Sequence, residues 1–137
     1  MTNQKSADKL ISDAGFYFKE LQEAHRQKRW NVVVRRAQEV VELSLKAVLK
    51  MAGIEYPKVH DIAPLLDKII DERGIKVEEE EIREIKKISG SLARERGPAF
   101  YGERDFSKED ATKAQEGAKK VLKFARNLLG KLGNKRK

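Results

Sequence analysis

The segment from Asn31 to Ala52 constrains the fold of this chain more than any other part of it. Its polar side chains recur every three or four residues, so they fall on one narrow stripe of an α-helix. These residues are Arg35, Glu39, Glu42, Lys46 and Lys50. The rest of the circumference is mainly Val, Ala and Leu, and such a helix must be covered from more than one side. We therefore predict that it is the central helix of an all-α protein.

The other segments also have a helical period, and none alternates as a β-strand would. We predict four further helices, over residues 6–27, 61–73, 78–96 and from 108 onward. The short connections between them favour antiparallel neighbours. The predicted fold is an up-and-down antiparallel helical bundle of four to five helices.

Local signals predict where these helices begin and end. Ser107 and Asp110 have the spacing of a capping box, which places the start of the last helix. Asp61 is the expected N-cap of the third helix. Gly97 and Pro98 are expected to stop the fourth helix, because proline removes a backbone donor and clashes with the preceding turn.

The length of 137 residues suits one domain, which we predict over residues 6–132, followed by a basic tail, residues 133–137, whose composition permits disorder. The chain has no cysteine, which excludes thiolate chemistry and favours an intracellular setting. No apolar run approaches the length of a membrane span, so we expect a soluble, cytoplasmic protein that does not enter membranes. The formal charge of +8 favours polyanions such as nucleic acid.

Most catalytic and metal-binding arrangements are missing from the sequence. The only two histidines, His25 and His60, have no metal-site spacing, and no catalytic triad order or phosphate-binding glycine loop occurs. We therefore expect no metal and no cofactor. Glu42 and Lys46 are four residues apart on the polar stripe, and we interpret them as a modest surface ion pair.

One segment combines arginines with aromatic residues: "LARERGPAFYGERDF", residues 92–106. Guanidinium groups bind phosphate bidentately, and exposed aromatic rings can stack on a base. Arg94, Arg96, Tyr101 and Arg104 are the predicted nucleotide- or phosphate-binding residues. The alternative is structural: arginines at a helix C-terminus interact favourably with its dipole, and the aromatic rings close the end of the bundle.

Two stretches resemble the HEPN domain family, which is named for nucleotide binding in higher eukaryotes and prokaryotes. The first is "WNVVVRRAQEVVELSLKAVLKMAGIEYPKVHDIAPLL". Its family-like positions are Ala37, Glu39, Glu42, Leu45, Lys46, Ala47, Leu49, Gly53, His60 and Asp61. The second, "LARERGPAFYGE", is similar to an Arg-rich segment of archaeal-type members. The resemblance covers residues 6–132.

This resemblance implies a helical bundle that forms a homodimer and works with a minimal nucleotidyltransferase, as a toxin–antitoxin-like pair. Active members are metal-independent ribonucleases with an Arg-x(4–6)-His motif. By position the arginine carries over to Arg96, or alternatively to Arg94. The residue five positions after Arg96 is Tyr101, so the motif histidine is absent. A tyrosine has an ordinary pKa of about 10 against about 6.5 for histidine, which makes it a poor base near neutral pH.

The leading hypothesis is therefore a module that binds nucleotide or RNA without ribonuclease activity. One alternative is a metal-independent ribonuclease that uses Arg96 with Tyr101 or a base placed elsewhere. The other is a helical protein-interaction module whose arginines are structural.

Overall fold

The structure is a computed structural model that describes residues 2–56 and 58–136, with side chains up to residue 133. Within these residues the chain forms five α-helices and one short 3-10 helix, and no β-strand. The elements are α1 (Asn3–Arg26), α2 (Trp30–Met51), η1 (Ala63–Leu65), α3 (Leu66–Arg73), α4 (Glu79–Tyr101) and α5 (Lys108–Arg136). The prediction of an all-α bundle is confirmed.

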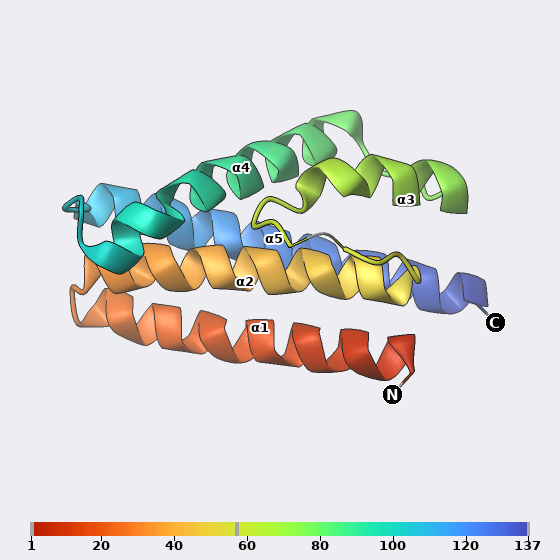
Figure 1. Cartoon of the computed structure of the whole chain (residues 1–137), viewed down its shortest axis with the longest axis horizontal. Helices are drawn as coiled ribbons and strands as arrows, with labels where there is room; N and C mark the ends of the chain where they lie inside the picture. Colours follow the sequence, from red (N-terminus) through yellow and green to blue (C-terminus); the bar gives the residue numbers. More distant parts are fainter. Residues whose placement is uncertain (1, 57, 137) are drawn as a thin grey trace.

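Helix α2 lies at the centre of the bundle, with α1 on one side, α4 on the other and α5 behind it (Figure 1). Helices α1 and α4 run against α2, whereas α5 runs in the same direction (Figure 1). The apolar circumference of α2 supplies much of the core: Val40, Leu45, Val48 and Leu49 are fully buried. The three neighbouring helices cover the apolar circumference of α2, as its sequence predicted. This burial stabilises the fold, because removing apolar surface from water is the main favourable term in folding.

The predicted end of α4 is wrong. The helix continues through Gly97 and Pro98 to Tyr101 and ends at Gly102, which adopts the left-handed conformation with a φ of 65°. The backbone amide of Glu103 donates to the carbonyl of Pro98 at 3.0 Å and closes the helix end. Proline disfavours a helical residue before it through a clash that involves the Cβ atom. Gly97 has no Cβ, so the helix can pass.

The predicted start of the third helix is also wrong. Asp61 is not an N-cap; its Oδ1 accepts a hydrogen bond from Ser89 Oγ in α4 at 2.7 Å. The chain first forms η1, with Pro64 in its first turn, and α3 begins only at Leu66. The tertiary contact with α4 therefore uses the side chain that a local cap would have needed.

The capping box of the last helix is confirmed. The amide of Asp110 donates to Ser107 Oγ at 3.1 Å, and the amide of Ser107 donates to Asp110 Oδ2 at 2.9 Å. The hydrogen bond from the Ser107 amide to the Asp110 carboxylate is the main reason that the pKa of Asp110 lies below its ordinary value. Helix α5 then continues to Arg136, so the backbone of most of the predicted basic tail is helical, and Lys137 lies outside the described residues.

Among the residues that the structure describes, no helix is both long enough and apolar enough to span a bilayer.

Candidate functional site

A cavity of about 270 Å³ lies where the C-terminal end of α4 meets α1 and α2. Its lining comprises two arginines, three carboxylates, two aromatic rings, an amide and one aliphatic side chain. These residues are Asp13, Tyr17, Arg35, Gln38, Glu39, Glu42, Leu43, Arg96 and Phe100. Because the cavity draws on three helices, only the folded bundle creates it.

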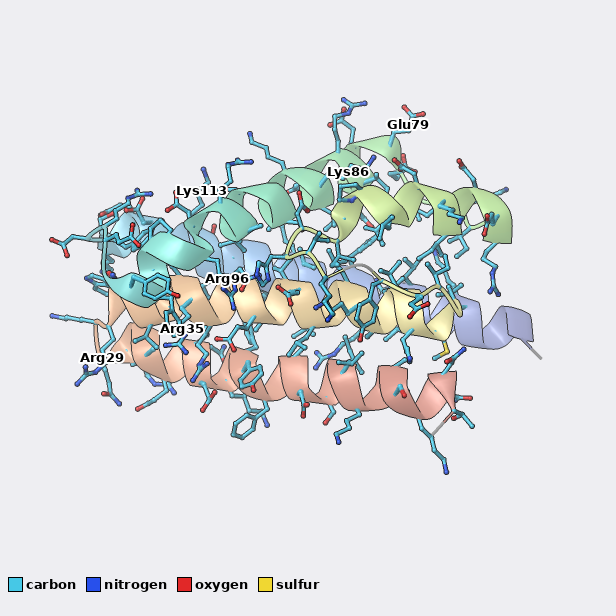
Figure 2. The ribbon with its side chains drawn as sticks, in the orientation of Figure 1. Arg29, Arg35, Glu79, Lys86, Arg96 and Lys113 are labelled. Carbon is cyan, nitrogen blue, oxygen red and sulfur yellow. The ribbon has the colours of Figure 1, made fainter. Side chains whose placement is uncertain are left out.

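The extension of α4 beyond Gly97 forms one wall of this cavity. Ala99 is buried against the bundle, and Phe100 is the next residue of the same turn. The guanidinium carbon of Arg35 lies 4.1 Å from the centre of the Phe100 ring, a cation–π contact that ties α4 to α2. Arg35 and Arg96 lie close together where the end of α4 crosses α2 (Figure 2).

The two arginines differ in how their charge is balanced. Arg35 Nε lies 3.8 Å from Glu39, and the same carboxylate is held more closely by Arg36 at 2.7 Å. The Arg96 side chain is exposed and has no ion pair or hydrogen bond within the described part of the chain. The guanidinium of Arg96 therefore offers its N–H donors to the cavity, and no acceptor among the described residues occupies them.

Glu42 is half-buried at the other end of the cavity, with 17% of its side chain exposed. Its carboxylate accepts hydrogen bonds from Lys46 Nζ at 2.8 Å, Gln38 Nε2 at 2.8 Å and His60 Nδ1 at 2.7 Å. Burial alone would raise the pKa of Glu42, but the hydrogen bonds from Lys46, Gln38 and His60 outweigh it and hold the pKa below its ordinary value. The predicted ion pair of Glu42 and Lys46 is confirmed, but its expected place on the surface is wrong, because the pair belongs to a half-buried network.

The segment that carries His60 is fixed to α4 as well as to α2. Ser89, which holds Asp61, is 2% exposed. One turn further along α4, Arg94 approaches the same segment: a Cβ atom added at Gly90 would lie 3.4 Å from both Arg94 Nη1 and Asp61 Oδ2. Arg94 thus lies beside the residue that follows His60.

Tyr101 and Phe100 lie in the last turn of α4. The predicted stop at Gly97 and Pro98 had placed them in a loop after the helix. Tyr101 is 71% exposed and Phe100 47% exposed, and their rings are edge to face with centres 4.9 Å apart. This pair does not plug the end of the bundle, because both rings remain accessible. An exposed aromatic ring next to an arginine is a surface on which a base can stack.

Arg104 is separated from the other predicted site residues. It is held by Glu95 at 2.7 Å and by Asp110 at 3.3 Å, and its guanidinium lies 4.5 Å from the centre of the Phe106 ring. It lines a different cavity, of about 420 Å³, between α4 and α5. Arg104 thus connects the end of α4 to the start of α5, and it does not take part in the cavity that contains Arg96.

Comparison with family models gives a match to the HEPN domain over residues 7–128. The chain belongs to the HEPN domain family. Comparison with curated proteins gives no match. Membership of this family supports a module related to nucleotides or RNA.

The HEPN match agrees with the two stretches that carried the resemblance, and the structure explains why they are coupled. The helix with Glu42 and the loop with His60 and Asp61 meet through hydrogen bonds, and Asp61 in turn binds Ser89 of α4. These contacts position the arginine-bearing half of α4 against α2.

Arg35 is the arginine of this cavity that sequence reasoning missed. Its only signal was its place on the polar stripe of an otherwise apolar helix. A polar stripe on a helix that is covered from three sides must face a partner, a cavity or solvent. The sequence does not distinguish these three possibilities, and the structure shows that Arg35 faces a cavity.

Proposed function

We propose that the cavity between α1, α2 and α4 binds the phosphate group of a nucleotide or of RNA. The observation that carries the proposal is the guanidinium of Arg96, which has no ion pair among the residues that the structure describes and lines the cavity beside Arg35. Arginine binds phosphate through two parallel N–H donors, and such charge-assisted bonds are stronger than neutral ones. Arg94 is two residues away on the same helix, so it leaves α4 on a different side from Arg96, and its exposed charge is available to a second phosphate of a longer ligand.

The aromatic rings at the end of α4 fit the base of the same ligand. Tyr101 is exposed and is followed by the helix end at Gly102, so a base can approach its ring. Stacking of a base on an aromatic side chain is worth about 1–3 kcal/mol. In this proposal Arg96 binds the phosphate and Tyr101 stacks the base, whereas Arg104 serves only to hold α4 against α5.

The proposal predicts that Arg96→Met lowers the affinity for RNA and nucleotide by about 10-fold, which corresponds to about 1.4 kcal/mol. The measurement is fluorescence anisotropy of a labelled single-stranded RNA at low salt. The matched control is Lys113→Met, which removes an exposed cation from α5 outside this cavity (Figure 2). Equal losses in both variants would show a diffuse charge effect, and no loss in Arg96→Met would reject the site.

We further propose that the protein is a homodimer and acts with a minimal nucleotidyltransferase in a toxin–antitoxin-like pair. The support is the resemblance described above, together with the exposed ring of Phe16, which a partner can cover. Light scattering after size-exclusion chromatography tests the dimer, with a mass near twice 15.7 kDa expected. A monomer at micromolar concentration contradicts it.

The proposed pair has a different test. We expect a gene for a small nucleotidyltransferase next to the gene for this chain, and we expect the two proteins to co-purify.

A further inference from the structure

The cavity of about 420 Å³ between α4 and α5 is separate from the proposed phosphate site, because no residue lines both it and the cavity that contains Arg96. Its volume falls within about 300–1,000 Å³, the usual range for pockets that bind small molecules. Its walls come from α4, α5 and the loop between them, and Val34 of α2 also lines it. It is therefore a second candidate binding site in the bundle.

Ion pairs between α4 and α5, which run in opposite directions, mark the two ends of this cavity (Figure 1). At one end Lys120 of α5 binds Glu84 of α4. At the other end Arg104 binds Glu95 of α4 at 2.7 Å and Asp110 of α5 at 3.3 Å. Glu95 follows Glu84 by eleven residues, which at a rise of about 1.5 Å per residue separates the two ends by about 16 Å. A peptide that continued along the groove would have to break one of these ion pairs, whereas a small molecule fits between them.

The floor of the cavity is apolar. Leu92 and Phe106 are each 6% exposed, and Val34 is 3% exposed. Ile88 packs closely against α5 because its neighbour there is a glycine: a Cβ atom added at Gly117 would lie 3.0 Å from Ile88 Cγ2. An apolar ligand body placed on this floor is removed from water, which favours binding.

Two polar side chains of α4 lie between the ion pairs. Lys87 and Ser91 both line the cavity, and because they are four residues apart their side chains are neighbours on one face of the helix. Within the described part of the chain, neither has an ion pair or a side-chain hydrogen bond. Lys113, which lines the cavity from α5, already interacts with the charge of Asp110. Lys87 and Ser91 thus offer an ammonium group and a hydroxyl to a ligand.

The charges of the lining favour a ligand with a single negative charge. Three carboxylates and three cations line the cavity, and one of the carboxylates, Glu84, is neutralised from outside by Lys120. One positive charge is therefore left over. Arginine is the side chain that binds phosphate bidentately, and Arg104, the arginine of this lining, is already bound to two carboxylates. A carboxylate fits these groups better than a phosphate does.

We propose that the cavity between α4 and α5 binds a small molecule with an apolar body and one carboxylate. Lys87 and Ser91 bind the carboxylate at the rim, and the apolar body lies on Leu92 and Phe106. This site does not depend on the proposed function, because it shares no residue with the cavity of Arg96.

Nuclear magnetic resonance of the ¹⁵N-labelled full chain tests this proposal, with sodium octanoate at pH 7 as the probe. Octanoate carries an apolar chain and one carboxylate, and it is added below the concentration at which it forms micelles. We expect saturable shifts of the backbone amides of Ser91, Ala114 and Gly117, which line the cavity. Asp13 and Leu43, which line the other cavity, are expected to stay unshifted.

Two variants and an uncharged probe test the role of the charge. Lys87→Met keeps the aliphatic stem and is expected to weaken octanoate binding by about 2- to 5-fold, the effect of an exposed ion pair. The same variant is expected to bind octan-1-ol as wild type does, because the alcohol carries no charge. The matched control is Lys123→Met, which removes an exposed cation of α5 outside the lining and is expected to leave the octanoate affinity unchanged.

A third variant tests the location of the site independently of its charge. Ser91→Phe places a ring in the cavity and is expected to abolish the shifts caused by both probes, while circular dichroism verifies that the variant is helical. Wild type without saturable shifts at Ser91, Ala114 and Gly117 overturns the proposal, and a second copy of the chain that covers the cavity would give this result. Lys87→Met that binds octanoate as tightly as wild type, or that loses octan-1-ol to the same extent, also overturns it.

Discussion

Glu42 illustrates what the sequence predicted at the scale of single residues and what it did not. The spacing of Glu42 and Lys46 predicted their ion pair, because residues four apart on a helix are neighbours. The spacing carried no information about His60, which lies 18 residues away and reaches Glu42 only through the fold. The same holds for Arg96: its exposure could be anticipated, but its neighbour Arg35 comes from a helix that is distant in the sequence.

The network at Glu42 predicts a pH-dependent stability. The pKa of Glu42 is lowered in the folded state, so its ionised form stabilises the protein above its ordinary pKa of 4.5. This contribution is lost as the pH falls through the lowered folded-state pKa. We expect Glu42→Gln to reduce the free energy of unfolding by about 1.5–3 kcal/mol at pH 7, the usual range for a hydrogen bond to a charged group.

Urea denaturation at several pH values measures this effect. The difference between wild type and Glu42→Gln is expected to be constant from pH 7 down to about pH 5 and to shrink at lower pH. A difference that stays the same down to pH 2 would show that the Glu42 charge contributes nothing.

At the scale of elements, the signals that are satisfied locally were predicted correctly and those that tertiary packing overrides were not. The capping box of α5 needs only Ser107 and Asp110, which are three residues apart. The end of α4 could not be predicted in the same way. Pro98 weakens the helix locally, yet burial of Ala99 and the contact of Phe100 with Arg35 favour one more turn. That turn is part of the candidate site.

The observed end of α4 predicts opposite effects for two glycine substitutions. Gly102→Ala is expected to lower the free energy of unfolding by about 1 kcal/mol, because alanine disfavours the positive φ of 65°. Gly130 lies in the interior of α5, and among the described residues a Cβ added there would meet no atom within 4 Å beyond the adjoining helix backbone. Gly130→Ala is therefore expected to raise the free energy of unfolding by up to about 1 kcal/mol. Urea denaturation gives both values. If Gly102→Ala is as stable as wild type, the chain does not end α4 at Gly102.

At the scale of the whole molecule, the fold class was predictable because it depends on a pattern repeated along the chain. The period of 3.6 residues gave the helices, and the apolar circumference of α2 gave its central place. The relative directions of the helices followed less directly, since α5 runs parallel to α2 and packs against it (Figure 1). The net charge of +8 indicated polyanions without locating them. A candidate binding place emerges only from the ion pairs of the described residues, which hold Arg104 but include neither Arg94 nor Arg96.

The salt dependence of RNA binding tests most directly whether Arg96 contacts phosphate. For single strands, the logarithm of the affinity falls with the logarithm of the salt concentration by about 0.7 for each phosphate that the protein neutralises. Anisotropy titrations of wild type and Arg96→Met over a range of salt give the two slopes. The account predicts that the slope of Arg96→Met is smaller by about 0.7, while Lys113→Met keeps the wild-type slope. Identical slopes for wild type and Arg96→Met would contradict a phosphate contact at Arg96.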